Sequence, residues 1–136
     1  MFRLTEEMFK CGQPVAQGEV LIWMKKYAPK SLLKAIDGLK FKEMNLENDQ
    51  MILGHSETGH HHVLEAVRPD VHIKNAAQAL IDEVNDTFVE VRMLEECKLV
   101  HKRGHDTHQG FIFPAGEYIR VIREEQSPEG WRRVAD

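Results

Sequence analysis

Apolar and polar side chains alternate along the stretch Thr87-Phe88-Val89-Glu90-Val91-Arg92-Met93-Leu94. Alternation of this kind places the apolar side chains on one face of an extended chain, which is typical of a half-buried β-strand. Residues 117–123 predict another strand, which follows the turn residues Pro114-Ala115-Gly116. These two stretches indicate that the core of the protein is built around a β-sheet.

Further short apolar runs on either side of these stretches predict more strands. They are bounded by glycine, proline or polar residues, as expected where strands end in turns. We predict strands in residues 18–24, 51–54, 60–65, 98–101 and 111–113.

Two segments predict helices, and the end of the chain predicts none. Apolar residues recur at helical spacing in residues 31–39, where Ser31 is a candidate N-cap. Residues 75–84 are the best helix candidate, with Asn75 as its cap. Residues 131–136 are expected to form a short tail. We therefore predict one domain, residues 1–136, with a mainly β fold: a small barrel or sandwich with about two short helices.

Composition excludes several classes of function. The chain has a net charge of −4 and a pI of about 6.1, which does not favour nucleic acid as a partner. The N-terminus lacks a secretory apolar core, and no apolar stretch approaches the roughly 20 residues of a membrane span. Cys11 and Cys97 match no zinc or redox spacing and are expected to be reduced. We expect a cytoplasmic protein, for which a small-molecule substrate and homo-oligomer formation are both compatible with the sequence.

Two clusters hold most of the eight histidines and indicate a metal site. His60 and His62 stand in Gly59-His60-His61-His62, whereas His105 and His108 stand in Gly104-His105-Asp106-Thr107-His108. Imidazole is the commonest protein ligand for divalent transition metals. A fifth candidate ligand is His55. The alternative interpretation is that all of these are surface-loop histidines.

The spacing within each cluster predicts its geometry. Residues two apart in a strand share a face, so His60 and His62 can converge on one ion while His61 points the other way. His105 and His108 are three apart and are expected on a turn or a single helical turn bracketed by Gly104 and Gly110. The other histidines, His72 and His101, are expected to be ordinary, and His101 lies in an apolar run.

The expected cofactor is a divalent transition metal, zinc or else iron or manganese. A closed tetrahedral zinc site would be structural, whereas an open coordination position would admit water or substrate. Acids near the clusters could compensate the charge of the ion or orient an imidazole ring. Of these, Glu125 and Glu57 are our candidates for a general base.

Part of the sequence resembles the cupins, which are double-stranded β-barrels that bind metal. Their first motif has a glycine, five residues, His-x-His and then a glutamate, and it is similar to Gly54, His60, His62 and Glu65, although Glu65 comes one residue early. Their second motif begins Pro-x-Gly, as in Pro114-Ala115-Gly116, but no histidine follows here. The resemblance implies a cupin-like barrel.

A second resemblance is closer and covers mainly residues 54–65 and 99–136. A group of small phage and bacterial proteins carries Gly-His-x-His, a later His-x-x-His and a Leu-Pro-x-Gly-x-Tyr strand, similar to residues 59–62, 105–108 and 113–118 here. Phe113 stands where that group has leucine. The resemblance implies a phage or bacterial protein in which His60, His62, His105 and His108 act together, and it implies no chemistry.

Three functions are compatible with these observations. The first is a metal-dependent enzyme, hydrolytic or oxygen-using, of unknown substrate. The second is a non-catalytic phage or bacterial accessory or structural protein with a stabilising metal site. The third, an interaction module, is disfavoured for nucleic acid by the acidic balance. No phosphate loop, Ser-His-Asp order or nucleotide fingerprint offers another catalytic lead.

Overall fold

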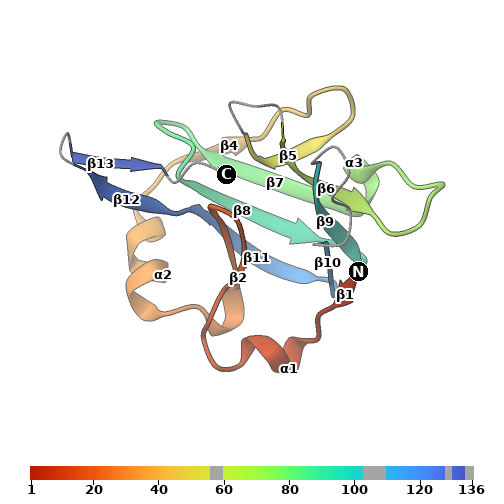
Figure 1. Ribbon diagram of the computed structural model, residues 1–136, viewed down its shortest axis with the longest axis horizontal. Helices are drawn as coiled ribbons and strands as arrows, with labels where there is room; N and C mark the ends of the chain where they lie inside the picture. The colour runs from red at the N-terminus through yellow and green to blue at the C-terminus, as the bar shows by residue number, and fades with distance from the viewer. Residues whose placement is uncertain (56–59, 103–109, 128–129, 134–136) are drawn as a thin grey trace.

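Two antiparallel sheets packed on a shared core make up the protein in the computed structural model (Figure 1). The structure describes residues 1–55, 60–102, 110–127 and 130–133, and for residues 124–127 and 130–133 it describes the backbone alone. The core joins residues of both sheets, for example Leu64 and Leu99 of one with Val89 and Tyr118 of the other. The arrangement is therefore sandwich-like.

The first sheet has five strands in the order β1-β10-β9-β6-β5. Only the short edge strand β1 runs parallel to its neighbour, and the other pairs are antiparallel. Its strands are β1 (Phe2–Arg3), β5 (Met51–Gly54), β6 (His62–Ala66), β9 (Cys97–His101) and β10 (Phe111–Phe113).

The second sheet has six antiparallel strands in the order β2-β3-β11-β8-β7-β4. Its strands are β2 (Val15–Gln17), β3 (Val20–Met24), β4 (Phe41–Glu43), β7 (Ala77–Asp82), β8 (Phe88–Met93) and β11 (Gly116–Ile122). In β8 the alternation behaves as predicted, because Val89, Val91 and Met93 are buried whereas Arg92 is exposed.

Three short α-helices and one 3₁₀ turn accompany the sheets in the described residues. They are α1 (Glu6–Phe9), η1 (Lys25–Tyr27), α2 (Lys30–Asp37) and α3 (Ile73–Ala76). The helix predicted for residues 31–39 is confirmed as α2, although Pro29 rather than Ser31 occupies its N-cap.

The helix predicted for residues 75–84 is wrong. Only α3 is helical, and residues 77–82 form β7 between β8 and β4. Ala77 and Ala79 are buried while Gln78 and Leu80 are exposed, so the segment has the two-residue period of a strand. Pairing with β8 on one side and β4 on the other outweighs the helix propensity of its alanines.

Two further expectations are corrected. The sheets are open, with β1 and β5 at the edges of one and β2 and β4 at the edges of the other, so the closed barrel is wrong and a cupin-like barrel is not confirmed. Residues 131–133, expected as part of a tail, lie in β13 (Gly130–Arg133), which pairs with β12 (Glu124–Ser127) in a hairpin. This hairpin projects from the sheets at the left of Figure 1.

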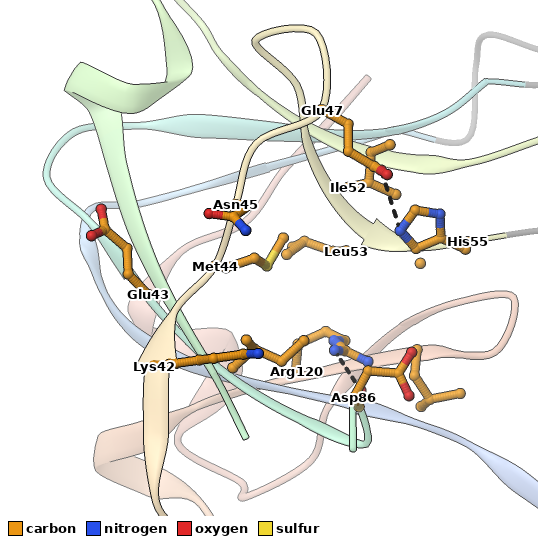
Figure 2. Close-up of a pocket in the computed structure, with 13 residues that line it drawn as sticks. Lys42, Glu43, Met44, Asn45, Glu47, Ile52, Leu53, His55, Asp86 and Arg120 are labelled. Carbon is orange, nitrogen blue, oxygen red and sulfur yellow. Dashed lines mark hydrogen bonds and ion pairs between the residues drawn. The ribbon is translucent and has the colours of Figure 1, made fainter. Parts of the chain in front are cut away.

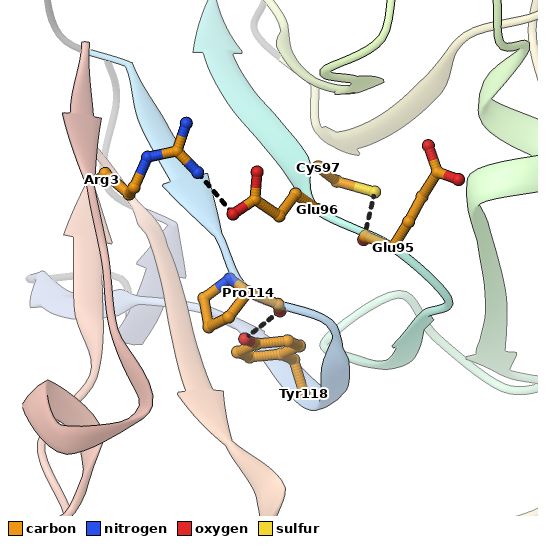
Figure 3. A network of polar contacts seen from close by, with 6 residues as sticks. All are labelled: Arg3, Glu95, Glu96, Cys97, Pro114 and Tyr118. Atoms are coloured by element: carbon orange, nitrogen blue, oxygen red, sulfur yellow. Dashed lines mark hydrogen bonds and ion pairs between the residues drawn. The ribbon is translucent and has the colours of Figure 1, made fainter.

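Aromatic packing closes the end of the core near the N-terminus. Phe9 of α1 lies 6.2 Å from Phe113 and 5.6 Å from Tyr118 between ring centroids. The Tyr118 hydroxyl donates a 2.6 Å hydrogen bond to the carbonyl of Pro114, and Arg3 pairs with Glu96 nearby (Figure 3). These contacts tie the turn between β10 and β11 to the core.

No helix in the described part of the chain is long and apolar enough to cross a membrane.

Candidate functional site

Histidines gather where β5 ends, β6 begins and β9 ends. The register of the β6–β9 ladder sets His62 opposite His101, and their rings stack at 4.0 Å with an interplanar angle of 14°. The His60 ring lies edge-on to His101 at 6.5 Å. We call the five residues His55, His60, His61, His62 and His101 the histidine end. His101, expected to be ordinary, is its centre.

β6 begins at His62, so His60 and His61 precede the strand in which they were predicted to lie. The side chain of His61 contacts His55. Its ring lies 5.2 Å from that of His55, so these two histidines form a second contact. His55 is exposed and holds its Nε2 3.4 Å from Oε2 of Glu47. The histidine end thus has a buried side, with His62, and a solvent side, with His55.

Several predicted site residues lie outside the described residues or are described only in part. Glu57, His105 and His108 fall in residues 56–59 and 103–109. The backbone of Glu125 is in β12, and its side chain is outside the description. The residues that flank the two undescribed segments lie close together, because the N–H of Lys102 donates to the carbonyl of His61 at 2.8 Å.

The ring of His62 is fully buried and is held by two polar side chains from the β2–β3 turn. Its Nδ1 lies 2.7 Å from Oε1 of Gln17, and its Nε2 lies 3.3 Å from Oε2 of Glu19. Gln17 and Glu19 are themselves 5% and 3% exposed. A buried carboxylate beside a buried imidazole is costly to form unless the two are paired, so this contact is a specific feature of the fold.

Gln17 favours one tautomer of His62. Its Nε2 donates to the carbonyl of Leu99 at 3.3 Å, so its Oε1 faces the imidazole. An amide oxygen only accepts, so this contact favours the tautomer in which Nδ1 of His62 carries the proton. The other ring nitrogen, Nε2, faces Oε2 of Glu19.

Gly54, the last residue of β5, permits the close packing around His62. A Cβ atom at this position would lie 2.6 Å from Cγ2 of Val20, 2.9 Å from Cδ2 of His62 and 3.3 Å from Oε1 of Glu19. The absence of a side chain at Gly54, the glycine of the Gly-x₅-His-x-His pattern, is therefore explained by its close packing against Val20, His62 and Glu19.

A pocket of about 270 Å³ borders the histidine end through Gly54 and His55 (Figure 2). We call it the Arg120 pocket, because Arg120 of β11 is the buried charge in its wall, at 3% exposure. One guanidinium nitrogen, Nη2, donates a 2.7 Å hydrogen bond to the backbone carbonyl of Asp86. Its Nε is buried and has no hydrogen-bond partner among the described residues.

Two opposing effects set the charge of Arg120. Burial lowers the pKa of its guanidinium to about 10, and the nearby Glu19 carboxylate partly offsets this effect. The guanidinium therefore keeps its proton at neutral pH. Glu19 therefore interacts electrostatically with Arg120 in the pocket wall and also lies beside His62.

Sequence reasoning missed Gln17, Glu19 and Arg120. Each is a polar residue beside or within an apolar strand: Glu19 comes immediately before β3, and Arg120 lies between Ile119 and Val121. An ionisable residue flanked by buried strand positions was the available signal, since such residues are rarely buried without a partner. Only the fold shows that two of them face the same histidine.

The described residues do not by themselves complete a metal site. Within residues 1–55, 60–102, 110–127 and 130–133, no three His, Cys, Asp or Glu side chains are placed so that they could hold an ion. Cys11 and Cys97 are both free, the first exposed and the second buried. A metal at the histidine end would need a donor from outside the described residues.

Comparison with known proteins places the chain in one family. No curated protein and no solved structure matches it. A family model described as a domain of unknown function, DUF8820, matches residues 16–124, which include both sheets' central strands, the histidine end and the Arg120 pocket. The chain therefore belongs to the DUF8820 family.

Proposed function

We propose that this protein binds a divalent transition metal ion at the histidine end. The observation that supports the proposal is the pairing of His62 with His101 in the β6–β9 ladder, together with the contact of the His60 ring with His101. Imidazole is a ligand that suits zinc, iron, copper and nickel, so a cluster of imidazoles favours a transition metal.

His60 and His101 are the described ligands in this proposal, and His105 and His108 are the remaining ones. The ring centroids of His60 and His101 are 6.5 Å apart, and the rings are nearly perpendicular, at 78°. His62 and His55 stay predicted ligands, although both ring nitrogens of His62 face Gln17 and Glu19 in this structure.

The buried Glu19 supports the proposal in a second way. Carboxylates and amides behind a histidine fix its ring orientation and raise its basicity, and metal centres commonly use them so. Here Gln17 and Glu19 hold His62, and His62 stacks on His101. The stack fixes the orientation of the His101 ring.

Elemental analysis of protein purified without a histidine tag tests the proposal. We expect roughly one bound transition-metal ion per chain, lost in the His60→Ala/His101→Ala double variant because two ligands are removed. His72→Ala is the matched control, since His72 is an exposed histidine at the N-cap of α3 and is not part of the histidine end. Metal content below about half an equivalent that is the same in all three proteins would contradict the proposal.

The pH dependence of binding provides an independent check. Protonated imidazole cannot ligate, so affinity should fall as pH drops below about 6.5. Affinity that is constant between pH 5 and 8 would exclude histidine ligands. Thermal denaturation with and without a chelator then separates the two functions: a large loss of stability on chelation indicates a structural ion, and a small loss indicates an open, catalytic one.

A further inference from the structure

Two cationic side chains from different strands enter the Arg120 pocket. Arg120 comes from β11 in the middle of the second sheet, and Lys42 comes from the edge strand β4 (Figure 2). Both side chains extend into the space between these strands and β5. Two like charges in one pocket repel each other, and a bound anion would offset that repulsion.

Among the described residues no carboxylate forms an ion pair with either cation, and the Glu19 carboxylate acts on Arg120 only at longer range. Neither Arg120 nor Lys42 has a carboxylate within the 4.0 Å of an ion pair in the part of the chain that is described, and the hydrogen bond of Arg120 goes to a neutral backbone carbonyl. The buried Nε of Arg120 also lacks a partner among the described residues. A guanidinium has five N–H donors, and the hydrogen bond to Asp86 uses one of them.

The acids that border the pocket are directed elsewhere. Glu47 pairs with His55 at the rim. Glu43 is the next residue to Lys42 on β4 and points away from Arg120 in Figure 2, as neighbouring strand residues do. The carboxylate of Asp86 lies beyond the guanidinium, on the side opposite Lys42 in the same view. None of these three carboxylates therefore lies between Lys42 and Arg120 in Figure 2.

The pocket wall also has an apolar part, formed by Met44, Ile52, Leu53, Ile81 and Ile122. Apolar side chains together with a few placed polar groups are typical of small-molecule sites. We propose that the Arg120 pocket binds a small molecule with an oxyanion head, a carboxylate or a phosphate, and an apolar body, and that Arg120 and Lys42 hold the head.

Nuclear magnetic resonance titration tests this site with two probes, sodium phosphate and sodium hexanoate, at constant ionic strength. Saturable shifts are expected for the backbone amides of Leu53, Gly54 and His55, which line the pocket. Saturation with phosphate alone identifies a phosphate head, with hexanoate alone a carboxylate head, and with both a general oxyanion site. No saturable shift at these amides with either probe overturns the proposal.

Lys42→Gln carries the mutational test, because Lys42 is exposed and its replacement leaves the core intact. We expect the affinity for the anion to fall about tenfold, the effect of losing one charge-assisted contact. Lys40→Gln is the matched control: it removes the same charge from the same segment but does not line the pocket. Equal affinities in the two variants would also overturn the proposal.

The titrations are made with a chelator present. Anion binding at Arg120 and Lys42 then does not depend on the metal proposed for the histidine end. A protein that binds no metal at the histidine end can therefore still bind an anion in the Arg120 pocket, and the reverse also holds.

Discussion

Gly54 has no space for a Cβ atom. Because a Cβ would come within 3.0 Å of both Val20 and His62, Gly54→Ala must displace buried side chains. We expect a loss of about 1–3 kcal/mol in the free energy of unfolding, as for other overpacked cores, measured by urea denaturation.

Gly38→Ala is the control for this prediction. Gly38 follows α2, has a negative φ of −94°, and a Cβ there would meet nothing within 4 Å. Its replacement should leave stability unchanged or slightly raised, because alanine restricts the unfolded chain. Similar losses for both glycines would show that crowding at Gly54 is not the cause.

The two cysteines should differ sharply in reactivity. Burial raises the pKa of the Cys97 thiol to about 12, with a smaller contribution from Glu95, so almost no thiolate forms near pH 8. Cys11 is exposed. With a disulfide reagent at pH 8, one thiol per chain should react quickly and the second only after denaturant is added. Rapid reaction of two thiols in the native protein would contradict the burial of Cys97.

Cys97 also contributes to the pH dependence of stability. Since its pKa is raised in the folded state, the unfolded chain loses the thiol proton first as pH rises from about 9 towards about 12. The stabilisation is therefore complete below pH 9 and is lost through this range. Cys97→Ala should lose part of this alkaline dependence in denaturation curves measured between pH 8 and 11.

At the scale of elements, β7 is the segment whose structure depends most on its neighbours. Its alanines favour a helix in isolation, but β8 and β4 offer hydrogen-bond partners on both sides and the core accepts Ala77 and Ala79. A helix over residues 75–84 would have turned Leu80 and Ile81 towards the core. In β7, Leu80 is 42% exposed.

This difference can be measured by substitution with asparagine. Leu80→Asn should change the free energy of unfolding by less than about 0.5 kcal/mol, because the side chain is at the surface. Ala79→Asn should cost more than about 2 kcal/mol, because it buries an amide without a partner. The reverse order would indicate a helix.

The register between β6 and β9 is the element-scale feature on which the histidine end depends. A shift of one residue would move His62 to the opposite face and separate it from Gln17 and Glu19. The sequence could identify His60 and His62 as a pair, but not that His101, 39 positions after His62 in the chain, would stack on it. Cross-strand neighbours are set by pairing, which local patterns do not encode.

At the scale of the whole molecule, the β12–β13 hairpin is separate from both sheets in its hydrogen bonding. The match to the DUF8820 family also ends at residue 124. An isolated two-stranded hairpin adds little stability of its own. A chain that ends at Arg123 should therefore unfold cooperatively with a midpoint within a few degrees of the full-length protein.

The truncation also tests one candidate catalytic residue. Glu125 is removed with the hairpin, whereas the histidine end and the Arg120 pocket remain. Metal content should be unchanged in the shortened chain. Loss of the metal would show that β12 or β13 takes part in the site, and a large drop in the midpoint would show that the hairpin packs on the sandwich.

The sequence by itself determined that the fold is mainly β, where most central strands lie, and which histidines are clustered. Alternation, turn residues and short spacings are local properties, and they are readable wherever one face of a segment is buried, as in β8. It did not determine that two open sheets form instead of a barrel, because closure depends on which edge strands pair, and β1 and β5 remain at the edges here.

Only the tertiary structure decided the composition of the candidate sites. Gln17, Glu19, Gly54 and Arg120 come from four different strands or turns, and burial brings them to one end of the core. The physical reason is that burying a charge is costly without compensation, so the fold places His62 and Arg120 where Glu19 can act on both. Such compensation acts through space, and spacing along the chain carries no trace of it.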